Sequence, residues 1–211
     1  MGFAKLEHCR GDSSSSHYCP ISSIAGSHPR RFDRTGNHRF HMQTASGLLN
    51  ADHRLPSLTY NDLLKLTRAL ARDQRAVDKV FIRMLFNVLA HNRDDHTKNH
   101  SFLMAADGSW TLSPAYDLTF STGPGGEHAM AVSGEGRRPS LEHILMAAKD
   151  AGIIQSKVPD MLDKTAAAIS CWPDLARKCG VSPATVTAIT SELNAVRREV
   201  SPALPGIGGQ N

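Results

Sequence analysis

The polar segment from His91 to His100 contains the residues whose types and spacing best suit chemistry. It holds two adjacent carboxylates, Asp94 and Asp95, and the carboxamide of Asn99. A carboxylate can accept a proton from a hydroxyl group, and carboxylate and carbonyl oxygens are ligands that Mg²⁺ accepts. The segment is therefore a candidate for proton transfer beside a bound divalent cation.

The spacing Asp-x-x-x-x-Asn from Asp94 to Asn99 is that of a kinase catalytic loop, where the Asp accepts the substrate hydroxyl proton and the Asn holds magnesium. Asp117, after a predicted hairpin, has the place of the second metal ligand, and Lys98 could supply a cation near the phosphate. Phosphoryl transfer depends mainly on positioning and charge neutralisation, so these groups would suffice. By spacing alone, a solvated polar loop explains the same residues equally well.

The elements that must position these side chains can be predicted from apolar periodicity. Apolar residues at three- and four-residue steps predict a buried helix from Arg75 to Ala90, which ends where the polar segment begins. A capping box of Thr59 and Asp62 predicts an earlier helix that runs to about Arg72. The polar segment thus lies on a loop held by rigid elements, as catalytic groups often do.

Strands and further helices flank this centre. A β-hairpin is predicted over 101–105 and 110–113, directly before Asp117. Upstream, short strands are predicted at 30–34 and 39–42, joined by the turn 35–37. From Ser140 onward the pattern predicts helices over 141–151, 158–170, 172–178 and 185–199.

These elements predict an α+β fold that is mainly α-helical, in one lobe over residues 30–200. Residues 1–29 contain a run of four serines and no apolar periodicity, so we expect them to be poorly ordered. Residues 201–211 contain two prolines and three glycines, and we expect a flexible tail there.

The composition is that of an ordinary soluble protein, with 40% hydrophobic and 21% charged residues. The net charge of +4 is too small to identify a partner. No stretch approaches the roughly 18 uncharged apolar residues of a membrane helix, and the first residues lack the apolar centre of a signal peptide. We therefore expect a cytoplasmic protein without a membrane partner.

A longer set of motifs resembles the signature of the HipA-like serine/threonine kinase toxins. The central motif is Asn87-Val-Leu-Ala-His-Asn-Arg-Asp-Asp-His-Thr-Lys-Asn-His-Ser-Phe-Leu-Met104, followed by Trp110-Thr-Leu-Ser-Pro-Ala-Tyr-Asp-Leu118. Arg31-Phe-Asp-Arg34 upstream, and Gly123-Pro-Gly-Gly-Glu-His128 and Gly134-Glu-Gly-Arg137 downstream, are also similar to this family. The resemblance covers about three quarters of the chain and implies the kinase-like C-terminal lobe of HipA, with the hairpin at its magnesium site.

The resemblance also implies roles for single residues. Asp94 would be the catalytic base, and Asn99 and Asp117 the Mg²⁺ ligands of a site that takes ATP as co-substrate. His96 and Lys98 fall on motif positions of the same nucleotide site. We interpret His96 as a residue that organises the loop by hydrogen bonding rather than as a proton shuttle.

Partners follow from the resemblance as well. Members of the family phosphorylate a serine or threonine of a protein, and an aminoacyl-tRNA synthetase is the candidate substrate. They are restrained by a helix-turn-helix antitoxin of the HipB type that binds DNA. The resemblance therefore implies contact with DNA only indirectly, through the antitoxin.

Two parts of a working kinase have no counterpart in the chain. A phosphate loop and a strand lysine should both precede Arg31, but Gly11-Asp-Ser-Ser-Ser-Ser16 is a poor substitute for the loop, and Lys5 is the only lysine before Lys65. The N-terminal lobe is thus mostly missing. We expect a truncated or frame-altered reading frame, which a longer upstream frame encoding that lobe would support.

Two alternatives remain open at this point. His91, His96 and His100, with the neighbouring carboxylates, could instead hold zinc. The chain could also be a catalytically inactive lobe that acts as a protein-binding module. Nucleotide binding distinguishes this module from an active kinase.

Overall fold

The computed structural model describes residues 31–50, 58–201 and 206–207. The expectations for residues 1–29, and for most of the tail from 201 to 211, concern residues outside these ranges. Of the tail, Ile207 is buried, and its backbone exchanges two hydrogen bonds with the side chain of Asn194.

The centre of the fold is a pair of consecutive helices, α2 (Tyr60–Ala71) and α3 (Gln74–Leu89). The predicted capping box is present, since Thr59 and Asp62 each bond the other's backbone N–H. The apolar stripe of α3 lies in the core, with Val77, Val80, Phe81, Met84, Leu85, Val88 and Leu89 at most 1% exposed. Both helices are confirmed within one residue of their predicted ends, because capping and amphipathic periodicity are local signals.

The predicted hairpin is confirmed as β4 (Ser101–Met104) and β5 (Trp110–Leu112). A third strand, β3 (His41–Thr44), pairs antiparallel with β4, so the sheet order is β3-β4-β5. The predicted upstream strands are shorter than expected, forming a two-stranded ribbon of β1 (Arg34–Thr35) and β2 (His38–Arg39). The partner of β3 is about 60 residues away, a long-range pairing that local propensity does not encode.

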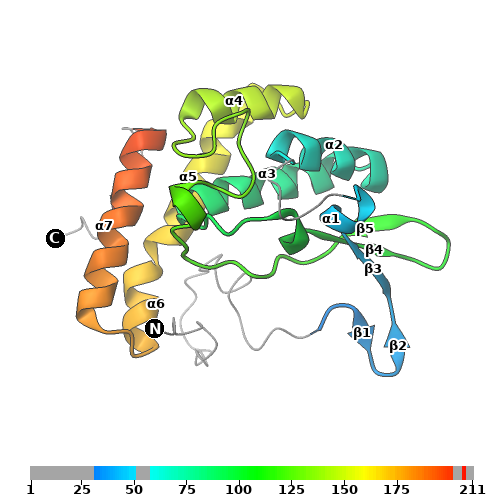
Figure 1. Ribbon diagram of the computed structural model, residues 1–211, viewed down its shortest axis with the longest axis horizontal. Coiled ribbons are helices and arrows are strands. Elements are labelled where there is room, and N and C mark those ends of the chain that lie inside the picture. Colours follow the sequence, from blue (N-terminus) through cyan, green and yellow to red (C-terminus); the bar gives the residue numbers. More distant parts are fainter. Residues whose placement is uncertain (1–30, 51–57, 202–205, 208–211) are drawn as a thin grey trace.

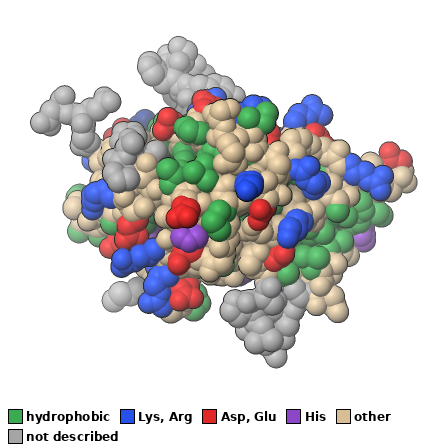
Figure 2. All heavy atoms as spheres, turned by 90° about the horizontal axis from the view of Figure 1, so that it is seen from above, with side chains coloured by type: hydrophobic (Ala, Val, Ile, Leu, Met, Phe, Trp, Pro, Cys, Tyr) green, Lys and Arg blue, Asp and Glu red, His purple; other side chains and the backbone are tan. Residues whose placement is uncertain are grey.

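The remaining helices follow the predicted order. They are α1 (Ala45–Leu48), which the sequence analysis did not predict, α4 (Leu141–Asp150), α5 (Val158–Ser170), α6 (Trp172–Lys178) and α7 (Pro183–Val200), with 3₁₀ turns η1 (Thr97–Asn99), η2 (Pro124–Gly126) and η3 (Gln155–Lys157). In Figure 1, α3 runs through the middle of the molecule, and α7 lies at the end opposite the sheet. Seen from above in Figure 2, hydrophobic side chains gather at the sheet end, while charges of both signs are interspersed elsewhere.

A buried arginine joins α7 to α5. Arg197 is 1% exposed, and its guanidinium donates to the backbone oxygen of Ala166 and to Oγ of Ser170 near the end of α5. Burial lowers the pKa of Arg197 to about 10. The side chain of Arg197 therefore satisfies the last turns of α5. Within the described ranges, no helix is long and apolar enough to cross a membrane.

Candidate active site

The polar segment leaves α3 with a sharp change of direction. His91 has a left-handed φ of 53°, and the backbone then forms a parallel bridge from Asn92 to Ser121. Two backbone hydrogen bonds support the bridge, from Arg93 N to Ser121 O (3.1 Å) and from Ser121 N to His91 O (3.0 Å). Through this pairing, the loop that carries Asp94 is held against the segment that follows Asp117.

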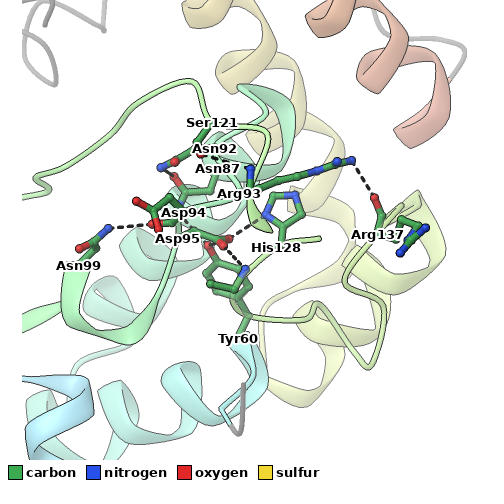
Figure 3. Close-up of polar contacts among 12 residues, drawn as sticks. Tyr60, Asn87, Asn92, Arg93, Asp94, Asp95, Asn99, Ser121, His128 and Arg137 are labelled. Carbon is green, nitrogen blue, oxygen red and sulfur yellow. Dashed lines mark hydrogen bonds and ion pairs between the residues drawn. The ribbon is translucent and has the colours of Figure 1, made fainter. Parts of the chain in front are cut away.

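Asp94 presents its carboxylate to solvent. Its side chain is 56% exposed, and Nε2 of His96 lies 3.8 Å from its Oδ1. Its backbone oxygen accepts a hydrogen bond of 3.0 Å from Nδ2 of Asn99, which closes the loop between the two residues (Figure 3). An exposed carboxylate on a braced loop is accessible to a substrate hydroxyl.

Asn99 and Asp117 line the same small cavity, of about 10 Å³. They come from different elements, since Asn99 ends the 3₁₀ turn η1 and Asp117 lies beyond β5. Asp117 has a left-handed φ of 57°, a conformation that is costly for a residue with a side chain and is enriched at functional sites. The structure therefore brings together the two residues that the sequence analysis paired.

The donor atoms of this pair suit Mg²⁺. The amide nitrogen of Asn99 is used by the bond to Asp94, whereas its Oδ1 has no hydrogen bond within the described part of the chain. The carboxylate of Asp117 is likewise without a bond to any described residue. A neutral and an anionic oxygen at one cavity are hard ligands, and Mg²⁺ takes its other ligands from water and phosphate.

Two basic residues form the inner wall of the cavity, Arg83 and His100. Arg83 donates through Nη2 to the backbone oxygen of Ser113, whereas its Nη1 is buried and has no partner in the described part of the chain. His100 is 2% exposed, and neither ring nitrogen has a partner among the described residues. Burial, together with the nearby charge of Arg83, lowers the pKa of His100 to about 3. His100 is therefore neutral near pH 7 and does not repel a cation in the cavity.

The second carboxylate of the motif, Asp95, is completely buried. Its Oδ2 accepts a hydrogen bond of 2.6 Å from the hydroxyl of Tyr60 and lies 2.9 Å from Nδ1 of His128. Its Oδ1 accepts a bond of 2.9 Å from the backbone N–H of Ala129. Two segments remote from Asp95 in sequence, the start of α2 and residues 128–129, thus converge on it, as Figure 3 shows for Tyr60 and His128.

A chain of hydrogen bonds extends this network towards the cavity. Asn87 on α3 donates through Nδ2 to the hydroxyl of Tyr60 (2.9 Å) and accepts through Oδ1 from Asn92 (3.0 Å). Asn87 and Asn92 both line the cavity that holds Asn99 and Asp117. Burial and the charge of Asp95 raise the pKa of Tyr60 well above its ordinary value, so its hydroxyl stays protonated and can donate.

His96 and Lys98 lie on the surface of the same loop. The ring of His96 makes no hydrogen bond to a described residue, contrary to our expectation, although its backbone oxygen accepts from Asn99 N (2.9 Å). Lys98 is exposed, and its backbone oxygen accepts a bond of 2.6 Å from the hydroxyl of Tyr116. The side chain that organises the loop is Asp95, because it is buried and fully hydrogen-bonded.

The structure does not support the zinc alternative. Among the residues that it describes, no three His, Cys, Asp or Glu side chains come together as a metal-binding group. The ring of His91 packs against Phe120, with 5.2 Å between their centroids, and His100 is buried at the cavity.

Sequence reasoning missed Asp95, Tyr60 and His128 as a unit. The sequence contains one signal for a structural carboxylate. Asp94 and Asp95 are adjacent, and if one of them is the exposed base, the other is left for a different role. Their partners could not be found in this way, since Tyr60 and His128 lie more than 30 residues from Asp95 on opposite sides of it along the chain.

Comparison with known proteins agrees with this arrangement. Residues 22–198 match the family model of the HipA-like C-terminal domain. The chain belongs to the HipA-like C-terminal domain family. The predicted family and the mainly helical fold with its small antiparallel sheets are thereby confirmed, while the roles of Asp94, Asn99 and Asp117 remain predictions.

A solved structure also resembles this HipA-like domain. It is HipA of the Shewanella oneidensis MR-1 toxin–antitoxin system, in complex with HipB and its operator DNA, with 22% sequence identity and a TM-score of 0.62. The match covers 80% of this chain and 47% of that chain, so the present chain spans about half the length of that relative. At this identity the likeness shows the fold. No curated protein matches the chain.

Proposed function

We propose that this HipA-like domain is the catalytic lobe of an ATP-dependent protein serine/threonine kinase of the toxin–antitoxin type. The observation that carries the proposal is the shared cavity of Asn99 and Asp117, with the exposed carboxylate of Asp94 on the loop that Asn99 closes. Phosphoryl transfer uses two side chains that bind Mg²⁺ next to an exposed base, and Asn99, Asp117 and Asp94 have this arrangement.

Each residue has a separate task in this proposal. Asn99 and Asp117 would hold Mg²⁺, which, when bound, neutralises charge on the phosphates of ATP. Asp94 accepts the proton of the acceptor serine or threonine hydroxyl as that oxygen bonds to the γ-phosphorus of ATP and the bond from this phosphorus to the ADP oxygen breaks, so that ADP leaves. His96 and Lys98 lie beside Asp94 and Asn99, and exposed Lys98 is available to a phosphate oxygen.

The partners are part of the same proposal. The matched relative is described in complex with HipB and operator DNA. By analogy, this chain would bind a HipB-like helix-turn-helix antitoxin in the cytoplasm and meet DNA only through it. Its substrate would be a protein, with an aminoacyl-tRNA synthetase as the first candidate to test.

The size of the cavity favours a second candidate function. A volume of about 10 Å³ accommodates about one water molecule and is far too small for a nucleotide, so the described residues form only one side of a nucleotide site. If nothing supplies the other side, the domain is an inactive lobe that binds a protein partner.

Calorimetric titration with Mg-ATP distinguishes the two functions. We expect binding by the wild-type chain that is lost in Asn99→Ala and in Asp117→Ala. Asp163→Ala is the matched control, because it removes an exposed carboxylate on α5 that does not line the cavity. Equal binding by all variants would contradict the proposed ligands, and absence of wild-type binding would favour the inactive module.

A further inference from the structure

A second and larger hollow lies beside the candidate base. It is a cleft of about 440 Å³ that is lined by His91 and Arg93. Asn92, which lies between them in the sequence, lines the cavity of Asn99 and Asp117 instead. Neighbouring side chains on a paired backbone segment point to opposite sides. The segment that leads into Asp94 therefore separates the cavity of Asn99 and Asp117 from the cleft.

The cleft has two different walls. One includes Gly123 and Gly126 of the glycine-rich loop, and the other is formed by α7 with Glu192 and Glu199. A Cβ atom at Gly123 would lie 2.7 Å from Cβ of Arg93, so only glycine lets the loop approach Arg93 so closely. The backbone at Arg93 thus contacts the glycine-rich wall of the cleft and leads directly into Asp94, the candidate base.

The charged groups of the cleft are incompletely paired. Arg93 donates through Nη2 to the backbone oxygen of Arg137 (3.0 Å), but its Nε is buried without a partner within the described ranges. Arg93 and Glu192 both line the cleft, and neither forms an ion pair with a described residue. Glu199, in contrast, lies 3.8 Å from Nε of Arg138.

His91 adds a buried polar atom to the same cleft. Its side chain lines the cleft although the residue is only 6% exposed, and its Nδ1 has no hydrogen bond to any residue that the structure describes. Buried polar atoms in native proteins are nearly always satisfied, by protein, water or a ligand. The nitrogens of His91 and Arg93 are therefore candidates to bond water or a ligand group in the cleft.

We propose that this cleft binds the acceptor polypeptide next to its phosphorylated serine or threonine, with an acidic side chain at Arg93 and a basic side chain at Glu192. The inference rests on the proposed kinase function. Its volume is within the range of about 300–1,000 Å³ of ligand sites. Two arginines and two glutamates line the cleft, so a peptide that carries both charges complements it better than a polyanion such as a nucleotide.

Peptide binding tests the inference without requiring catalysis. The probes are fluorescent nonapeptides with a central serine, in an alanine–glycine background, with Glu and Lys placed in turn at every pair of flanking positions. The reference set has Gln at both places, and binding is measured by fluorescence anisotropy. We expect one arrangement of Glu and Lys to bind at least about fivefold more tightly than its reference.

Variants then assign the preference to the two walls. Arg93→Gln should remove the advantage of Glu over Gln, Glu192→Gln should remove that of Lys, and Arg93→Lys should keep most of the advantage of Glu because it keeps the charge. Arg137→Gln is the matched control, since its exposed guanidinium pairs with Glu127 and does not line the cleft. Thermal unfolding of each variant establishes that it is folded.

The outcomes separate this inference from the proposed function. No preference in the wild-type chain, or a preference unchanged by both Arg93→Gln and Glu192→Gln, would overturn the acceptor cleft even if Mg-ATP binds at Asn99 and Asp117. A preference that depends on Arg93 and Glu192 supports the cleft, and it would do so even if Mg-ATP binding failed and the kinase assignment were lost.

Discussion

The hydroxyl of Tyr60, the first residue of α2, donates a hydrogen bond of 2.6 Å to the buried carboxylate of Asp95, 35 residues further along the chain. The same hydroxyl accepts from Asn87 on α3. One phenol therefore connects two core helices to the residue that immediately follows the candidate base. The stability of the core and the position of Asp94 are coupled through this contact.

Replacing Tyr60 with Phe should lower the free energy of unfolding by about 1–3 kcal/mol, because buried polar partners lose their bond to the hydroxyl. Chemical denaturation monitored by circular dichroism measures this change. Tyr116→Phe is the comparison, since Tyr116 is only partly buried and the same change there should cost less. An equal loss in both variants would contradict the special role of Tyr60.

The two adjacent carboxylates should respond in opposite ways to the same substitution. Asp94→Asn should change the free energy of unfolding by less than about 0.5 kcal/mol but remove phosphotransfer, since it deletes the base at an exposed position. Asp95→Asn should cost about 1–3 kcal/mol, because the buried carboxylate accepts from three groups.

Denaturant titration and transfer of labelled phosphate to a protein acceptor measure the two properties separately. Phosphotransfer by Asp94→Asn at the wild-type rate would remove Asp94 from its proposed role. A fully stable Asp95→Asn variant would show that the buried network contributes little to folding.

Gly123→Ala should destabilise the chain by more than Gly108→Ala. Both glycines have a positive φ, of 67° and 81°, so both variants pay roughly 1–2 kcal/mol for the left-handed backbone. Only at Gly123 does the added Cβ also meet other atoms, at 2.5 Å from the backbone oxygen of Glu127. Melting temperatures of the two variants give the comparison, and equal values would mean that the loop relaxes freely.

The neighbouring arginines of α7 make a similar pair. Arg197→Met should lower the free energy of unfolding by about 1–3 kcal/mol, because α5 loses buried hydrogen bonds from the guanidinium. Arg198→Met should stay within about 0.5 kcal/mol, since Arg198 is exposed. Denaturant unfolding measures the free energy of unfolding of both variants. Equal losses in the two variants would contradict the α5–α7 contact.

Stability should also fall in mild acid, in part through His91. Burial and then the charge of Arg93 lower the pKa of His91 below its ordinary value of 6.5, so the unfolded chain binds the proton more readily than the folded chain. The free energy of unfolding should therefore decrease as the pH falls below about 6.5. His91→Gln should show a shallower decrease between pH 6.5 and 5, and a slope identical to that of the wild type would exclude His91 as a contributor.

The sequence by itself determined the helices other than α1, the hairpin and the candidate residues Asp94, Asn99 and Asp117. The capping box of Thr59 and Asp62, the apolar stripe of α3 and the turn between β4 and β5 are encoded over a few residues, so local patterns suffice to find them. The spacing of Asp94 and Asn99 is a local signal of the same kind.

Only the tertiary structure decided which of the two carboxylates is buried and what surrounds it. The pairing of β3 with β4, the convergence of Tyr60 and His128 on Asp95, and the cleft between Arg93 and α7 join residues that are remote in sequence. Such contacts depend on how whole elements pack, because hydrophobic burial is non-directional and many sequences satisfy it. The position of each partner is therefore set by the assembled core and not by the residues beside it in the chain.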